Sequence, residues 1–163
     1  MQKMDDQVLS ILDVSYKHGE SVRVLNSIFS EWFSDPKTLH FTSPKLKYPF
    51  NINQWIKLFY TADNNTKSYI LKANKWIIGH ISVRINEDNN SAHLFHLIIE
   101  SDNRRKGYAK KLIKYVQKKV SKDNIKCITI NCVRKNNPAI SLYQTLGFKK
   151  IKEERWLKMI KYI

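Results

Sequence analysis

The amino-acid sequence predicts an α/β fold in which a mixed, mostly antiparallel central sheet is flanked by helices. Three observations lead to this prediction. Apolar residues in the first third recur with the period of a helix, the pattern changes to that of paired strands from residue 67 onward, and a strand–helix–strand unit lies between two antiparallel hairpins. The 163 residues contain no repeat and no linker, so we expect a single domain that spans residues 1–163.

The first third of the chain is expected to contain one strand and two helices. Residues Val8–Val14 predict the strand, and Glu20–Phe33 predict the first helix, which Asp35-Pro36 is expected to end. The apolar side chains of that helix recur every three or four positions: Val24, Leu25, Ile28, Phe29 and Trp32. After an extended stretch over Ser43–Phe50, residues Asn53–Tyr60 predict the second helix.

The rest of the chain is expected to contain six strands and two helices. A turn at Asn74 separates the first two of these strands, because asparagine favours turn conformations. The helices are expected over Arg105–Val120 and Pro138–Leu146, and Gly147 is placed to end the second one. The six strands are expected over Lys67–Ala73, Lys75–Ile85, Ala92–Ile99, Ile125–Val133, Phe148–Glu154 and Arg155–Tyr162. The resulting order is β-α-α-β-β-β-α-β-α-β-β, and a ligand site is expected where the middle strand meets its helix.

The chain carries a net charge of +15, from 29 Lys and Arg residues against 14 Asp and Glu residues. Such a surface attracts polyanions, which include nucleic acids and phosphorylated cofactors. The lysines are spread over several expected elements, however, and no basic segment is interleaved with aromatic residues as in RNA-binding platforms. A nucleic-acid-binding module is therefore an alternative function and not the favoured one.

Other features of the sequence narrow the class of protein. No stretch of about 18 apolar residues could form a transmembrane helix, and the N-terminus lacks the pattern of a signal peptide, so we expect a cytoplasmic protein without a membrane partner. Cys127 and Cys132 lie five residues apart in one expected strand and point to opposite faces, so we expect no disulfide between them. A metal site built from these cysteines with His93 and His96 fails on facing and spacing, and no metal is expected. The sequence leaves open whether the chain forms a homodimer.

The segment Arg104-Arg105-Lys106-Gly107-Tyr108-Ala109 predicts a pyrophosphate-binding loop. It follows the apolar strand Leu94–Ile99 and opens a helix, whose N-terminal N–H groups and positive dipole end favour phosphate oxygens. Gly107 lets the backbone approach the phosphates because it has no Cβ, Ala109 keeps the next turn small, and Arg104 can add a charged contact. The segment is neither a Walker P-loop, which needs Gly-Lys-Ser/Thr, nor a dinucleotide fingerprint, which needs spaced glycines.

On two motifs the sequence resembles the GNAT family of acetyl-CoA-dependent N-acetyltransferases. The family's phosphate motif, Arg/Gln-x-x-Gly-x-Gly/Ala, is matched by Arg104, Gly107 and Ala109. Its later signature, an Asn, a short helix with a Tyr and then Gly-Phe, is matched by the run Asn136–Phe148. The resemblance covers Lys67–Lys158, and the N-terminal third is only loosely similar.

The resemblance implies the acyl-CoA N-acyltransferase fold and an enzyme that transfers the acetyl group of acetyl-CoA to a primary amine by direct attack in a ternary complex. The amine can belong to a small molecule or to a protein, and both its identity and the length of the acyl chain are left open. The alternative is a non-catalytic domain that binds acyl-CoA or nucleic acid. The basic net charge argues against a cationic acceptor such as spermidine, although Glu31 and Asp35 could outweigh it locally.

The resemblance also implies which residues hold the coenzyme. The backbone of Leu97, Ile98 and Ile99 is expected to bind the pantetheine arm as if it were an extra strand, with the Ile98 or Ile99 N–H facing the thioester oxygen. Strand splaying next to Asn131 is expected to open the slot. The remaining loop residues expected at the coenzyme are Arg105, Lys106 and Tyr108.

Acetyl transfer also needs a general acid and a general base. Tyr143 occupies the position of the family's acid tyrosine, four residues before the glycine of the Gly-Phe pair, and is expected to protonate the leaving thiolate beside the coenzyme. Asn136 is expected either to contact the coenzyme or to cap the short helix. His93 is the candidate base because histidine titrates near neutrality and this one lies eleven residues before Arg104, and a chain of waters is the alternative. His96 would face the other side in a regular strand.

Overall fold

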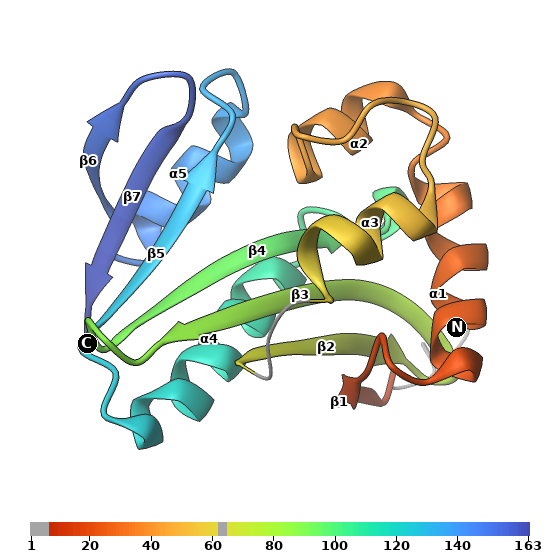
Figure 1. The fold of residues 1–163 in the computed structure, drawn as a ribbon, viewed down its shortest axis with the longest axis horizontal. Helices are drawn as coiled ribbons and strands as arrows, with labels where there is room; N and C mark the ends of the chain where they lie inside the picture. Colours follow the sequence, from red (N-terminus) through yellow and green to blue (C-terminus); the bar gives the residue numbers. More distant parts are fainter. Residues whose placement is uncertain (1–6, 62–64) are drawn as a thin grey trace, which may run out of the picture.

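The computed structural model describes residues 7–61 and 65–163. Within these ranges the strands form a seven-stranded sheet in the order β1-β2-β3-β4-β5-β7-β6, drawn in Figure 1. The strands are β1 (Leu9–Val14), β2 (Thr66–Ala73), β3 (Trp76–Asn86), β4 (Ser91–Ile99), β5 (Cys127–Cys132), β6 (Lys149–Glu153) and β7 (Leu157–Tyr162). The helices are α1 (Gly19–Trp32), α2 (Pro36–Thr42), α3 (Ile52–Phe59), α4 (Tyr108–Val120) and α5 (Asn137–Thr145), with short 3-10 turns at Ser101–Asn103 and Ser121–Asp123. The predicted fold class, a mostly antiparallel mixed sheet flanked by helices, is confirmed.

Helix α2 was not among the predicted elements. The sequence predicts that Asp35-Pro36 ends a helix, but the pair also begins one. The Asp35 carboxylate accepts from the Lys37 N–H at 3.2 Å and from the Thr38 hydroxyl at 2.8 Å, which satisfies donors of the first turn. Pro36 occupies the first helical position, where its missing N–H costs nothing. The observed order therefore has three helices, not two, between β1 and β2.

Helix α4 begins three residues later than predicted, at Tyr108 instead of Arg105. Arg105 has a φ of 62° and Gly107 has a φ of 82°, both in the left-handed region that a right-handed helix cannot contain. The predicted pyrophosphate segment is therefore a true loop up to Gly107. Glycine takes the second of these conformations without the steric cost of a Cβ.

The parallel strands β4 and β5 pair over only part of their length. Every other neighbouring pair in the described sheet is antiparallel. Pairing between β4 and β5 runs from Ser91 with Cys127 to Leu94 with Ile130 and then stops, whereas β5 continues its pairing with β7 as far as Cys132. Figure 1 shows β5, β7 and β6 fanning away from β4 beyond this point. The last five residues of β4 therefore lack a partner strand on the β5 side.

A β-bulge interrupts the alternation of β4. Phe95 lies opposite Ser82 of β3 and Ile98 lies opposite His80, so two residues of β4 face a single intervening residue of β3. His96, the first of these two, has a φ of 51°. An extra residue reverses which face the following side chains occupy.

Helices cover both faces of the sheet and divide the core in two. On one face α4 buries Leu112, Ile113 and Val116, and side chains of α5 join the same cluster. On the other face α1 and α3 contribute Phe29 and Trp55, neither of which has exposed surface. Within the described ranges, no helix is long and apolar enough to cross a membrane. Both cysteines are free thiols, as expected from their spacing.

Candidate active site

The gap between β4 and β5 opens onto a cavity of about 640 Å³. Residues of the phosphate loop, of the unpaired end of β4 and of α5 line it together, and the segment from Leu97 to Tyr143 that contributes them spans more than 40 positions of the sequence. Apart from Lys106, all the residues expected at the coenzyme line this cavity: Leu97, Ile98, Ile99, Arg104, Arg105, Gly107, Tyr108, Ala109, Asn131, Asn136 and Tyr143. The two sequence motifs therefore meet at one site.

The loop before α4 presents donors to the cavity. The first bond inside the helix runs from the Lys111 N–H to the Gly107 carbonyl at 3.1 Å, so the N–H groups of the three residues between them have no acceptor within the helix. Consecutive N–H groups next to a left-handed residue form a concave anion-binding nest. The positive end of the α4 dipole adds to this preference for phosphate oxygens.

Arg104 connects the loop to β4. Its Nε donates to the Ile99 carbonyl at 3.0 Å, which orders the last residue of the strand. In a strand the N–H and C=O of one residue point to the same side, so the Ile99 N–H also faces away from β3 and toward the open gap. The Glu100 N–H donates to the Ile78 carbonyl at 2.8 Å, and by alternation Ile98 is directed to β3 as well. Of the two N–H groups considered for the thioester oxygen, that of Ile99 lies on the cavity side.

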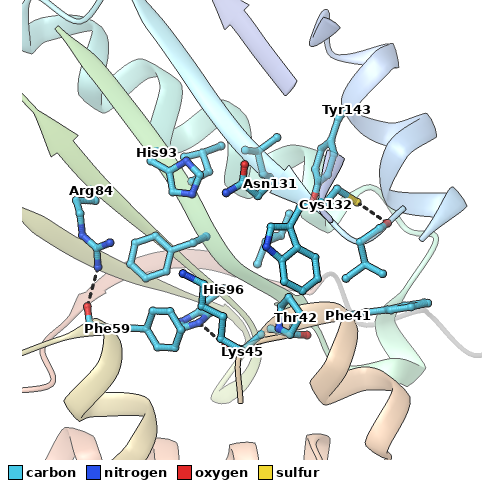
Figure 2. Close-up of a pocket in the computed structure, with 18 residues that line it drawn as sticks. Phe41, Thr42, Lys45, Phe59, Arg84, His93, His96, Asn131, Cys132 and Tyr143 are labelled. Atoms are coloured by element: carbon cyan, nitrogen blue, oxygen red, sulfur yellow. Dashed lines mark hydrogen bonds between the residues drawn. The ribbon is translucent and has the colours of Figure 1, made fainter. Parts of the chain in front are cut away.

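A second, smaller cavity of about 170 Å³ adjoins the first. Figure 2 shows its lining residues, among them His93 and His96 from β4 and Arg84 from β3. The two cavities share the side chains Phe41, Thr42, Leu97, Asn131, Cys132 and Tyr143. This shared wall is where a group held in one cavity would meet a group held in the other.

Tyr143 is held in place by the end of α5. Gly147 has a φ of 95°, which lets its N–H donate to the Gln144 carbonyl at 3.0 Å and lets the Phe148 N–H donate to the Tyr143 carbonyl at 3.0 Å. The Phe148 ring also packs edge-on against the Tyr143 ring, with centroids 6.0 Å apart. The Gly-Phe pair of the second motif thus fixes both the backbone and the ring of Tyr143.

The Tyr143 hydroxyl lies at the wall shared by the two cavities. In Figure 2 the ring comes from α5 and points toward Cys132. Within residues 7–61 and 65–163 this hydroxyl has no hydrogen-bond partner. It is also not among the fully buried polar atoms without a partner, so it is accessible from the cavity. Burial raises the pKa of Tyr143 above its ordinary value, and Cys132 adds to the shift. The phenol therefore keeps its proton over the physiological range.

His93 stands opposite Thr129 of β5, where the parallel pairing is still intact. Its Nδ1 lies 2.8 Å from the Thr129 hydroxyl, and its side chain lines the smaller cavity. Burial, and after it the charges of Arg84, Lys158 and Lys45 in that order, together lower the pKa of His93 to about 4. The ring is therefore neutral near pH 7, and no described residue pairs with its Nε2.

His96 lies on the same face of the sheet as His93, contrary to the expectation for a regular strand. The bulge is the reason, because it reverses the alternation between the two residues. The ring of His96 stacks on Trp55 at 3.8 Å, its Nδ1 lies 2.7 Å from the Tyr60 hydroxyl, and its Nε2 lies 2.9 Å from the Ser43 hydroxyl. Because both ring nitrogens already have partners, His96 contributes to the wall of the smaller cavity and is not a candidate base.

A third histidine, the fully buried His80, supports the bulge. His80 Nδ1 lies 2.8 Å from the His96 carbonyl, and a carbonyl can only accept, so this nitrogen carries the proton. Burial lowers the pKa of His80 to about 4, so the neutral ring accepts at Nε2 from the Tyr16 hydroxyl at 2.9 Å. These bonds satisfy a carbonyl that the bulge removes from the regular ladder.

Asn136 shows the capping bond that was one of its two expected roles. Its Oδ1 accepts from the Ala139 N–H at 3.4 Å, and α5 begins at the next residue, Asn137. Asn136 also lines the larger cavity, as does Asn131, an exposed residue beyond the last β4 pairing. The side chain that orders the start of α5 thus sits at the rim of the expected coenzyme site.

The sequence matches the model of a family described as an acetyltransferase (GNAT) domain over residues 50–163. The chain belongs to this family. It is therefore an acyltransferase, and the resemblance drawn from the two motifs is confirmed. No match was found among curated protein sequences.

Solved structures share the fold of this GNAT acetyltransferase at low sequence identity. A domain from Methanocaldococcus jannaschii superposes with a TM-score of 0.77 at 19% identity, covering 97% of this chain and 100% of that one. The PaiA N-acetyltransferase of Thermoplasma acidophilum, solved with coenzyme A, gives 0.73 at 19% identity over 96% and 99% of the two chains. Spermidine N-acetyltransferase of Vibrio cholerae, solved with CoA and spermine, gives 0.74 at 17% identity over 94% and 95%.

Sequence reasoning missed several residues that line the smaller cavity of this acetyltransferase. Phe41 and Thr42 come from α2, which the capping pair Asp35-Pro36 could have revealed. Arg84 comes from β3, and its guanidinium donates to the Phe59 carbonyl at 2.9 Å and lies 4.8 Å from the centroid of the Phe95 ring. The strand pattern carries no signal for Arg84, because its position depends on the register with β4.

Proposed function

We propose that this acyltransferase moves the acetyl group of acetyl-CoA onto a primary amine, of a small molecule or a protein, by direct attack in a ternary complex. The observation that carries the proposal is the wall shared by the two cavities. A coenzyme in the larger cavity and an amine in the smaller one would meet beside Tyr143, without a covalent intermediate on the protein.

The larger cavity suits the coenzyme in shape and charge. The N-terminus of α4 and the loop before it favour the pyrophosphate, and the unpaired edge of β4 offers Leu97 and Ile99 to the amide groups of the pantetheine arm. Coenzyme A is present in the structures of PaiA and of spermidine N-acetyltransferase, which share this fold. These points support acetyl-CoA as the cosubstrate.

Two side chains that line the smaller cavity, His93 and Tyr143, supply the proton transfers. The amine nitrogen bonds to the acetyl carbon while His93 Nε2 takes the proton that the nitrogen loses. The Ile99 N–H on the cavity side donates to the oxyanion that forms. The carbon–sulfur bond then breaks, and Tyr143 donates its proton to the departing thiolate, whose acid has an ordinary pKa of about 8.5. Acetylated amine and coenzyme A are the products.

The basic surface leaves two alternatives to exclude by experiment. A domain that binds acyl-CoA without turnover would be stabilised by the coenzyme and release no thiol. A nucleic-acid-binding domain would bind nonspecific DNA with an affinity that falls steeply with salt, and acetyl-CoA would not stabilise it. The lysines are spread over several segments of the sequence and are not concentrated in one basic stretch, which favours the enzyme over a nucleic-acid-binding domain.

The proposal is tested by thermal stabilisation with acetyl-CoA and by thiol release with a panel of primary amines. We expect Gly107→Glu to abolish both, because a carboxylate at the loop repels the pyrophosphate and a Cβ strains a residue with a φ of 82°. The matched control is Gly19→Glu. Gly19 begins α1, and a Cβ there meets no atom within 4 Å. Wild-type affinity in Gly107→Glu would show that the loop does not bind the coenzyme.

A further inference from the structure

The charged residues that line the smaller cavity are both cationic. They are Lys45, in the segment after α2, and Arg84, on β3, and no carboxylate lines this cavity among the described residues. From the sequence, the carboxylates of Glu31 and Asp35 could have outweighed the basic net charge at the acceptor site and so favoured a cationic acceptor. Glu31 is exposed and lines neither cavity, and the Asp35 carboxylate caps α2 on the side of the larger cavity.

Lys45 and Arg84 line the same cavity as His93, the proposed base, and their charges reach its ring. The charges of Arg84, Lys158 and Lys45 each disfavour the protonated form of the ring. A field that disfavours a proton on His93 also disfavours a second ammonium group on the acceptor. It favours an anionic group instead, and the attraction is stronger near the half-buried Arg84 than near the exposed Lys45, because water screens exposed charges.

The remaining wall of the smaller cavity is largely aromatic. Phe41, Phe59, Phe95 and Trp156 line it, and the guanidinium of Arg84 stacks on Phe95. The guanidinium also donates to the Thr66 hydroxyl at 3.3 Å and to the Phe59 carbonyl at 2.9 Å, so these bonds fix its positive charge at the cavity wall. The volume of about 170 Å³ lies below the range of about 300–1,000 Å³ that is usual for ligand pockets, so it suits a small acceptor.

We propose that the acceptor is a small primary amine that carries a carboxylate and an apolar or aromatic body, which is the chemistry of an aromatic or branched α-amino acid. Lys45 and the positive charge of Arg84 attract the carboxylate, the aromatic wall holds the body, and the amine faces the wall shared with the coenzyme cavity. A polyamine is excluded by its further positive charges. This inference rests on the proposed acetyl transfer and adds the class of acceptor to it.

The inference is tested with acceptors that differ only in the carboxylate. L-phenylalanine and L-phenylalaninamide share the ring and the primary amine, but the amide carries no negative charge, and spermidine represents the cationic class. Thiol release from acetyl-CoA gives kcat/KM for each acceptor with the intact wild-type chain. We expect phenylalanine to exceed both other acceptors by about tenfold to a hundredfold, the range that a hydrogen bond to a charged group provides.

Two lysines of the same segment provide the matched variants. Lys45 lines the smaller cavity, whereas Lys47, two residues later and also exposed, lines neither cavity. We expect Lys45→Met to lower kcat/KM for phenylalanine by about twofold to fivefold, with no loss for phenylalaninamide and no change in the KM of acetyl-CoA. Lys47→Met should leave all three values unchanged. Arg84 is kept, because its guanidinium also holds the Phe59 carbonyl.

The outcomes separate this inference from the proposed function. Turnover of the amide or of spermidine at or above the rate of phenylalanine overturns the acceptor class and leaves acetyl transfer intact. An equal loss in Lys45→Met and Lys47→Met also overturns it, because the effect is then one of surface charge in general. Stabilisation by acetyl-CoA without thiol release for any amine overturns the proposed function, and the acceptor class with it.

Discussion

Replacing Tyr143 by phenylalanine should impair catalysis without impairing the fold. The hydroxyl has no partner in the described part of the chain, so its removal breaks no hydrogen bond, and the ring keeps its contact with Phe148. We therefore expect the free energy of unfolding to change by less than about 0.5 kcal/mol. A general acid contributes about 10²- to 10⁴-fold to a rate, so kcat should fall by at least about a hundredfold.

The measurement is thiol release at saturating acetyl-CoA and amine, with urea unfolding of each variant alongside. Tyr115→Phe is the control, because Tyr115 lies on α4, packs edge-on against Tyr69 and lines neither cavity. Burial raises the pKa of Tyr143, so deprotonation of this group should not lower the wild-type rate between about pH 8 and about pH 10. A kcat for Tyr143→Phe within about twofold of wild type, with coenzyme affinity unchanged, would refute the acid role.

Three other perturbations test neighbouring parts of the structure. His93→Gln should lower kcat/KM by about a hundredfold. In a pH series of initial rates, protonation of His93 should not lower the wild-type rate until the pH approaches the His93 pKa of about 4. Gly79→Ala should destabilise the protein by about 1 kcal/mol relative to Gly19→Ala in urea unfolding, because the new Cβ would lie 2.8 Å from Ile99 Cδ1 and 3.2 Å from Leu112 Cδ1, and these side-chain ends must shift. A Cβ at Gly19 meets no atom within 4 Å, so equal stabilities would contradict the packing. The pKa values of His80 and His93, both about 4, lie below the unfolded value of about 6.5, so the unfolded chain binds more protons and stability falls as pH falls. Each ring should cost about 2 kcal/mol between pH 6.5 and about pH 5, and a urea midpoint that does not change over this range would contradict buried neutral histidines.

The fold was largely predictable because most of its elements have local signals. Strands and amphipathic helices show their period in the sequence, and Gly147 marks the end of α5 as expected. The start of α4 was misplaced because left-handed conformation at Arg105, a non-glycine residue, leaves no mark in the apolar pattern. Helix α2 was missed for a different reason. The pair Asp35-Pro36 can end the helix before it, and it can also cap the helix after it, so the sequence alone did not reveal the second role.

The lining of the larger cavity was also predictable, and that of the smaller cavity was not. The loop and the run Asn136–Phe148 are contiguous motifs whose geometry is fixed by local bonds. The smaller cavity is assembled from α2, β3 and β4, so its composition depends on long-range packing and register. His96 illustrates this dependence. A single bulge turns its side chain to the same face of the sheet as His93, and no pattern in the sequence predicts the bulge.

The divergence of β4 from β5 is what couples the two halves of the site. β5 keeps its pairing with β7 up to Cys132 opposite Leu157, so the half of its backbone groups that points to β7 stays bonded where β5 leaves β4. β4 keeps its pairing with β3 on the other side, with His80 supporting the bulge and Arg104 bonding to the Ile99 carbonyl. The end of β4 therefore presents backbone groups without a partner strand to the larger cavity, which its last residues line. A ligand that adds a strand there satisfies groups that the sheet leaves open, and the same gap lets Tyr143, from the face of α4 and α5, reach a cavity that His93 lines from the opposite face.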